Sequence, residues 1–154
     1  IRDFLLKPKV DVLIEEMDNL ELKILIREEA RRLRVPVLMA TGNADEVIID
    51  LERFDLNPSL ALLNGLLDKD VIRQIKHEKW NQEEKIRLSR DFIGKKYLHP
   101  RLWKSFSLVG KSLVGIPQLA ETSFLRGAVI CNFVRMIFLS GNKVKSGRYI
   151  LKMR

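Results

Sequence analysis

The sequence contains a single cysteine, Cys131, among 154 residues. One thiol excludes an internal disulfide and a zinc site built from several cysteines. Glycine is also sparse, and the eight glycines never give the G-x-G-x-x-G spacing of a nucleotide-binding turn. The run Gly110-Lys111-Ser112 fails the P-loop pattern as well, because a serine stands five residues before its glycine. Neither common phosphate-binding loop is therefore present in the chain.

Long apolar runs are missing too. The longest, Gly127 to Gly141, contains Asn132 and Arg135 and is shorter than the ~20 residues of a membrane-spanning helix. No secretory signal is visible. Apolar residues nevertheless make up 46% of the chain and charged residues 31%, a composition typical of a folded soluble domain. We therefore expect a cytoplasmic protein that does not contact a membrane.

Acidic residues are scarce in the second part of the chain. Residues 1–50 carry 8 basic and 11 acidic side chains, a net charge of −3, whereas residues 51–154 carry 20 and 9, a net charge of +11. A basic surface can attract phosphates, nucleic acid or acidic lipid headgroups. The basic residues are dispersed and not clustered in one run, so we favour an ordinary solvated surface and expect no nucleic-acid binding.

A strand–helix–strand unit is the clearest local pattern. Val10–Ile14 is a short apolar, β-branched run that predicts a buried strand. Leu20–Arg34 has helical periodicity, with Leu22 on its apolar face and either Asp18 or Asn19 as its cap. Residues 35–40 predict a second buried strand. Two strands joined by a helix are expected to be parallel, with a right-handed crossover.

Further elements follow along the chain. They are a strand at 46–51, a short helix beginning near 58–59, one or two surface helices at 69–90, a helix within 102–114, a long apolar helix at 123–139 and a final edge strand at 148–151. We therefore predict an α/β fold with a Rossmann-like three-layer partial sheet. Residues 1–67 form its strand–helix–strand part, and residues 68–154 form a mainly helical closing part.

Asp18 is placed where ligands bind in open α/β sheets, at the carboxyl end of a strand and the start of a helix. A carboxylate there can hold Mg²⁺ beside phosphate oxygens. It can equally do no more than cap the helix. The sequence leaves both interpretations open.

Several short motifs resemble those of the ThiF/MoeB/ubiquitin-activating-enzyme family. Residues 11–23 are similar to a family strand and turn in which an aspartate, often followed by asparagine, precedes Arg or Lys by five residues, here Asp18 and Lys23. Residues 35–40 are similar to the next family strand. The closing helix and strand of the family are similar to the segment here that contains Pro117, Gly127, Gly141 and Ser146-Gly147. Residues 50–56, 117–119 and 146–148 resemble a bacterial subgroup in which this domain precedes a nitroreductase-like one.

The resemblance implies ATP-dependent adenylation of a carboxyl group, often on a small ubiquitin-like or sulfur-carrier protein. Asp18 would then contact magnesium and the nucleotide, with Lys23 as the basic residue behind it. ATP and magnesium would serve the intact parent domain, and we expect neither to bind tightly to this chain. A homodimer is a further partner that the resemblance implies. Because the glycine loop is absent and the sequence begins at Ile1, we expect a carboxyl-terminal portion that is inactive alone.

A second hypothesis is a non-catalytic protein-interaction domain with the same fold. In that case the charged segment at 69–90 and the basic second part would contact a partner. Lys23 would be a solvated helix residue paired with Glu16 or Glu21. We expect Cys131 to be a buried core thiol, and Trp80 and Trp103 to pack in the core or at an interface.

Overall fold

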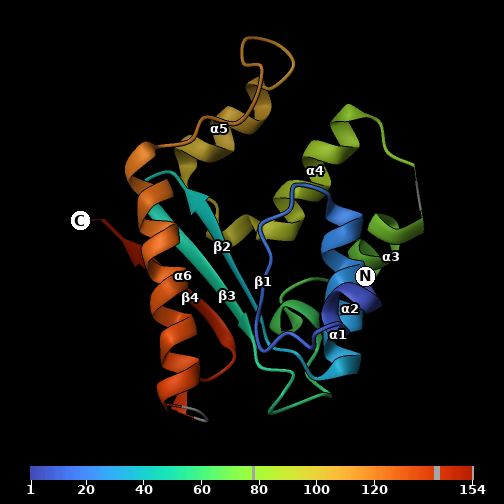
Figure 1. Cartoon of the computed structure of the whole chain (residues 1–154). Helices are drawn as coiled ribbons and strands as arrows, with labels where there is room; N and C mark the ends of the chain where they lie inside the picture. Colours follow the sequence, from blue (N-terminus) through green and yellow to red (C-terminus); the bar gives the residue numbers. More distant parts are fainter. Residues whose placement is uncertain (78, 141–142, 154) are drawn as a thin grey trace.

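A computed structural model describes residues 1–77, 79–140 and 143–153 of the chain (Figure 1). It contains a four-stranded mixed sheet with the strand order β1 (Leu13–Ile14), β2 (Val37–Asn43), β3 (Glu46–Glu52) and β4 (Gly147–Lys152). β1 pairs with β2 in parallel, and the other two pairings are antiparallel. The predicted α/β class, the parallel pair and the final edge strand are confirmed.

Helices make up most of the remaining structure. They are α1 (Arg2–Leu6), α2 (Leu20–Leu33), α3 (Lys69–His77), α4 (Gln82–Ile93), α5 (Pro100–Leu108) and α6 (Ala120–Ser140), with short 3₁₀ turns η1 (Leu62–Gly65) and η2 (Lys95–Tyr97). The sequence predicts the two surface helices α3 and α4 but not α1. Residues near 58–59, expected to begin a short helix, instead lie in a loop that leads to η1.

The β1–α2–β2 unit has well-defined helix ends. Asn19 is the N-cap of α2, and its side chain accepts a hydrogen bond from the Leu22 N–H at 2.9 Å. The helix ends at Arg34, which has the left-handed φ of 56°, and Pro36 then prevents its continuation. The expectation that Leu22 lies on the apolar face is wrong, because that side chain is 41% exposed.

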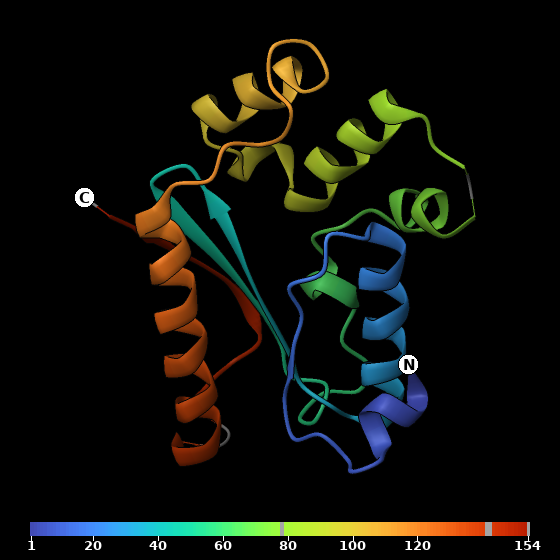
Figure 2. The ribbon, with the colours of Figure 1, turned by 45° about the horizontal axis from the view of Figure 1, so that its top comes forward.

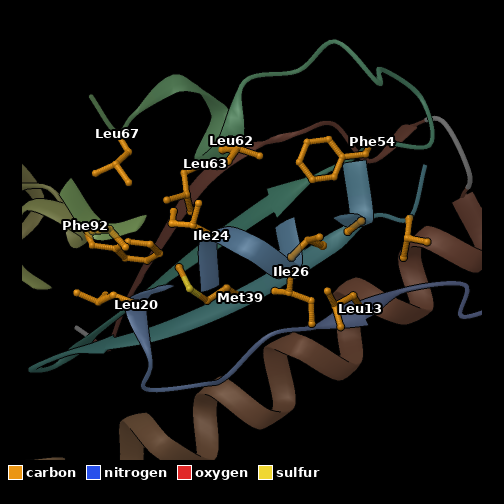
Figure 3. Close-up of a cluster of buried hydrophobic side chains, with 14 of the residues drawn as sticks. Leu13, Leu20, Ile24, Ile26, Met39, Phe54, Leu62, Leu63, Leu67 and Phe92 are labelled. Carbon is orange, nitrogen blue, oxygen red and sulfur yellow. The ribbon is translucent and has the colours of Figure 1, made fainter. Parts of the chain in front are cut away.

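Helices cover both faces of the sheet (Figure 2). Alternate side chains of β2 point to opposite faces. Val37 and Met39 join a core with α2, η1 and α4, whereas Leu38 and Ala40 join a second core with α6. Figure 3 shows the first core, in which Ile24 and Met39 lie close to Leu63 and Phe92.

β2 is longer than the sequence indicates. Its last three residues, Thr41, Gly42 and Asn43, are of types that are expected to end the strand in a turn. They continue the strand instead and pair with β3. Asn43 is fully buried; its amide donates to the Tyr97 carbonyl at 2.8 Å and its oxygen accepts from the His99 N–H at 2.8 Å. These contacts from far along the chain hold the strand in place where local propensity favours a turn.

Two expectations about α6 need correction. At 21 residues, α6 is long and apolar enough to cross a membrane by length and composition, although the sequence suggested a shorter segment. One of its faces packs on the sheet through Val129, Ile130 and Ile137, and 22% of its apolar window is buried. Cys131, expected in the core, is exposed instead. Because α6 is apolar nearly all round, its sequence does not indicate which face is buried.

Candidate functional site

A cavity of about 200 Å³ lies at the carboxyl ends of β1 and β2. Its lining comes from four segments of the chain, within residues 16–23, 39–42, 89–93 and 118–126. Its polar side chains include Glu16 and Asp18 after β1, Lys23 of α2, Thr41 of β2, Ser89 of α4, Gln118 before α6 and Arg126 of α6. The two residues expected to bind nucleotide and magnesium, Asp18 and Lys23, are therefore brought to one cavity.

Asp18 is exposed at the mouth of this cavity. The competing role, capping α2, is taken by Asn19. Within the described parts of the chain, the Asp18 carboxylate makes no hydrogen bond or ion pair. Both of its oxygens are thus available to an external ligand.

Lys23 is not the solvated residue of the alternative interpretation. Its side chain is 13% exposed, and its ammonium group forms an ion pair with Glu15, with Nζ to Oε1 at 2.9 Å. Among the described residues, Lys23 forms no ion pair with Glu16 or Glu21, the partners that the sequence suggests. Burial lowers the pKa of Lys23, and the neighbouring Glu15 carboxylate opposes this shift. Lys23 therefore presents a positive charge that Glu15 partly neutralises.

Behind Lys23 lies a buried chain of alternating charges. Glu15 accepts from Arg27 at 2.5 Å, and the Nε of Arg27 donates to Glu52 at 2.8 Å. All three of these side chains are 1% exposed or less. Glu52 also accepts from the Leu63 N–H at 2.6 Å, and Glu15 from the Met17 N–H at 2.7 Å. The network joins β1, α2, β3 and η1, and it fixes the turn that carries Asp18.

The two buried carboxylates respond differently to this environment. Burial raises the pKa of each, and Arg27 lowers it. For Glu15, Arg27 and Lys23 together outweigh burial, so its pKa is below the ordinary value. For Glu52, burial outweighs Arg27, so its pKa is above the ordinary value. The fold consequently favours the ionised form of Glu15 and disfavours that of Glu52.

We expect Glu15→Gln to lower the free energy of unfolding at pH 7 more than Glu52→Gln does. A depressed folded-state pKa gives stability that is present above the unfolded pKa of ~4.3 and is lost as pH falls through the folded value. A raised pKa gives stability that is present at low pH and lost as pH rises through the folded value. The difference in the free energy of unfolding between the two variants should therefore be smaller at pH 4 than at pH 7. Urea unfolding at the two pH values measures it. An equal or larger loss for Glu52→Gln at pH 7 would contradict this assignment.

Glu16 and Arg126 form the opposite wall of the cavity. Glu16 accepts from the Ala40 N–H of β2 at 2.8 Å, and its other oxygen lies 3.8 Å from an Arg126 guanidinium nitrogen. Partial burial raises the pKa of Glu16, while Ala40 and Arg126 oppose the rise. Because β1 is only two residues long, the Ala40 N–H donates to the Glu16 side chain instead of to the backbone of a neighbouring strand. Arg126, 28% exposed, remains close enough to contact an anion in the cavity.

The dimensions of the cavity limit what it can hold. Its volume of about 200 Å³ is below the ~300–1,000 Å³ of typical small-molecule sites. This space is enough for a phosphate group together with a cation. Among the described residues, no group of three or more His, Cys, Asp or Glu side chains could bind a metal ion. Asp18 supplies one carboxylate, which suits Mg²⁺ that is otherwise held by phosphate oxygens and water.

Sequence reasoning missed Glu15, Arg27, Glu52 and Arg126. One signal was present for Arg27, which follows Leu20 and Ile24 at the helical spacing of the buried face of α2. A charge on a buried face requires a buried partner. The sequence could not identify that partner, because Glu15 follows β1 and Glu52 lies at the end of β3.

The two tryptophans lie away from this cavity. Trp80 is partly buried against the first core, and its indole N–H donates to the Gln74 carbonyl at 3.2 Å. Trp103 is 40% exposed and stacks under the Arg90 guanidinium at 4.7 Å. Core packing is thus confirmed for Trp80, whereas Trp103 is a surface residue.

Comparison with known proteins finds a mycobacterial relative. The chain is 34% identical over 142 residues to a Mycobacterium tuberculosis (strain CDC 1551 / Oshkosh) protein described as "Uncharacterized protein MT1398". The similarity covers 90% of this chain but 19% of that protein, so the chain spans about a fifth of its relative's length. No family model matches the chain, and no solved structure matches it.

Proposed function

We propose that this chain is the carboxyl-terminal portion of a Rossmann-like, ThiF/MoeB-type adenylyltransferase domain that acts in the cytoplasm. The observation that carries the proposal is Asp18, which is free of its capping role and exposed in the cavity that Lys23 also lines. The parallel β1–α2–β2 unit supports it, because ligands in such sheets bind at the carboxyl ends of the strands.

The reaction would activate a carboxylate with ATP. A carboxylate oxygen attacks the α-phosphorus, a new carboxyl–phosphate bond forms, and the bond to pyrophosphate breaks. Asp18 would hold the magnesium ion that accompanies the phosphates, and Lys23 would offset their charge. The acceptor would be a small ubiquitin-like or sulfur-carrier protein, and a nitroreductase-like domain would adjoin this one. The much greater length of the mycobacterial relative leaves room for such a domain and for the missing glycine loop.

ATP–pyrophosphate exchange tests this proposal. The polypeptide from the whole reading frame should incorporate labelled pyrophosphate into ATP once its acceptor protein is present, whereas the 154-residue chain alone should not. The reason is that this chain lacks the glycine-rich loop that would hold the phosphates of ATP. The proposal would be refuted if the whole polypeptide showed no exchange with every ubiquitin-like acceptor tested.

A non-catalytic interaction domain is the second candidate. It is favoured by the outer face of α6, where Phe124, Phe138 and Leu139 are 81%, 62% and 79% exposed. Large apolar side chains in such positions are typical of contact surfaces. Stable association with a protein partner, together with no ATP turnover by the whole polypeptide, would support this candidate.

A further inference from the structure

A second cavity, of about 440 Å³, lies between α4, α5 and the loop that follows α5. The two helices lie side by side beyond the carboxyl end of β2 (Figures 1 and 2), and a third apolar cluster joins them. This cavity shares no lining residue with the one that contains Asp18. Its volume falls within the ~300–1,000 Å³ of small-molecule sites. It is therefore large enough to receive a ligand of its own.

The lining of this second cavity is apolar on one side and polar on the other. Gln82, Ile86 and Arg90 follow one another at intervals of four residues, so they lie along one face of α4. Across from them are Phe106, which is buried in α5, and Val109, which is half-buried in the loop. Such a lining suits a ligand that has an apolar body and one polar end.

Arg90 is a half-buried cation without a carboxylate partner. Its guanidinium stacks on the Trp103 ring at 4.7 Å, which fixes its position. Its Nε is buried and has no hydrogen-bond partner, and within the described parts of the chain the guanidinium forms no ion pair. The buried guanidinium groups of Arg27 and Arg148, by contrast, contact carboxylates at 2.8 and 2.7 Å. Because buried donors are usually paired, Arg90 is suited to an anion from outside the chain.

Lys111 adds a second cation at the rim of the cavity. It belongs to a closed turn in which Gly110 has a φ of 78°, a conformation that suits glycine. The N–H groups of Lys111 and Ser112 donate to the Leu108 carbonyl, and that of Gly110 donates to the Leu113 carbonyl at 2.9 Å. These N–H groups are therefore not available to cradle a phosphate. The turn instead holds the exposed Lys111 side chain over the cavity.

The charge of the cavity selects the kind of anion. Arg90 and Lys111 contribute two positive charges to the lining and Glu83 one negative charge, which gives a net charge of +1. A ligand with a single negative charge balances this lining. The surrounding segment attracts anions as well, because residues 82–113 carry 8 basic and 3 acidic side chains, a net charge of +5.

We propose that this cavity binds a small organic monocarboxylate. The carboxylate would lie between Arg90 and Lys111, where a planar guanidinium can hold both of its oxygens. The apolar part of the ligand would pack on Ile86, Phe106 and Val109. This inference does not rest on the adenylyltransferase proposal, and its test needs no ATP.

Calorimetric titration of the chain with four probes tests the ligand class. Phenylacetate has both the charge and the apolar body, and should bind with a Kd of about 1 mM or below, as expected for a ligand of about ten non-hydrogen atoms. Phenylacetamide lacks the charge and acetate lacks the apolar body, so each should bind at least ~10-fold more weakly. Inorganic phosphate, mostly a dianion with no apolar part, should also bind more weakly than phenylacetate.

Substitutions in the lining test the location of the site. Arg90→Met should weaken phenylacetate binding roughly 10-fold or more, the factor for a lost charge-assisted hydrogen bond. Lys111→Met should weaken it about 3-fold, since an exposed charge contributes less. Arg101→Met is the matched control, because Arg101 is an exposed arginine of α5 outside the cavity, and its replacement should leave binding unchanged. Circular dichroism checks that each variant folds, and the exposed position of Lys111 makes its variant informative even if Arg90→Met unfolds.

Several results would overturn the proposal. One is a chain that does not bind phenylacetate, and another is equal affinity for phenylacetamide or acetate. Tighter binding of inorganic phosphate would make the site a phosphate site instead. Equal losses for Arg101→Met and Lys111→Met would place the ligand elsewhere on the basic surface. Binding by the 154-residue chain but not by the whole polypeptide would show that another segment fills the cavity.

Discussion

Replacing Asp18 with alanine should reduce ATP–pyrophosphate exchange by the whole polypeptide at least ~100-fold, the usual loss when one charge-stabilising group is removed from a reaction centre. The Asp18 carboxylate is exposed in the cavity and has no partner among the described residues, so little else depends on it. Asp18→Asn should raise the magnesium concentration needed for half-maximal exchange, because an amide is a weaker ligand than a carboxylate.

Asp11→Ala provides the matched control for Asp18. Asp11 is also exposed, but it precedes β1 and therefore lies at the end of the strand away from the cavity. Its replacement should leave exchange and the magnesium dependence unchanged. If Asp18→Ala retains wild-type exchange, Asp18 has no role in binding the metal or the nucleotide.

Replacing Arg27 with methionine should have the largest effect on stability, a loss of ~3–5 kcal/mol in the free energy of unfolding. The substitution keeps much of the side-chain volume but leaves Glu15 and Glu52 buried without their shared cation. Since domains of this size are stable by only ~5–15 kcal/mol, the variant should unfold at much lower urea concentrations. Restoring neutrality with Glu15→Gln and Glu52→Gln in the same chain should recover part of the loss.

Arg32→Ala is the control for this measurement. Arg32 also lies on α2 and also pairs with a carboxylate, Glu29 at 2.6 Å, but its side chain is 56% exposed. Exposed ion pairs contribute ~0–1 kcal/mol, so this variant should unfold close to the wild type. Equal losses for Arg27→Met and Arg32→Ala would show that burial of the network contributes nothing.

Local sequence patterns were sufficient for most of the sheet and for several helices. The β1–α2–β2 unit, β3 and β4 follow from apolar runs and helical periodicity, which are properties of neighbouring residues. The last residues of β2 could not be predicted in this way. Asn43 is held in the strand by hydrogen bonds with Tyr97 and His99, more than fifty residues away. Contacts of that range leave no trace in local propensity.

The site was predictable only in part, for a similar reason. Asp18 and Lys23 stand close together in one short motif and could be identified from it. Arg126 reaches the same cavity from α6, more than a hundred residues later. The exposure of Cys131 could not be predicted either, since an apolar helix gives no periodic signal for its buried face. The sequence therefore did not predict how α6 packs on the sheet.

The most direct test of the proposed nucleotide site is a crystal structure of the whole polypeptide with magnesium and a non-hydrolysable ATP analogue. We expect the metal ~2.1 Å from an Asp18 carboxylate oxygen, with phosphate oxygens beside Lys23 and the base outside the 200 Å³ cavity. A nucleotide bound elsewhere, with Asp18 still in contact with solvent alone, would contradict the adenylyltransferase proposal for this chain.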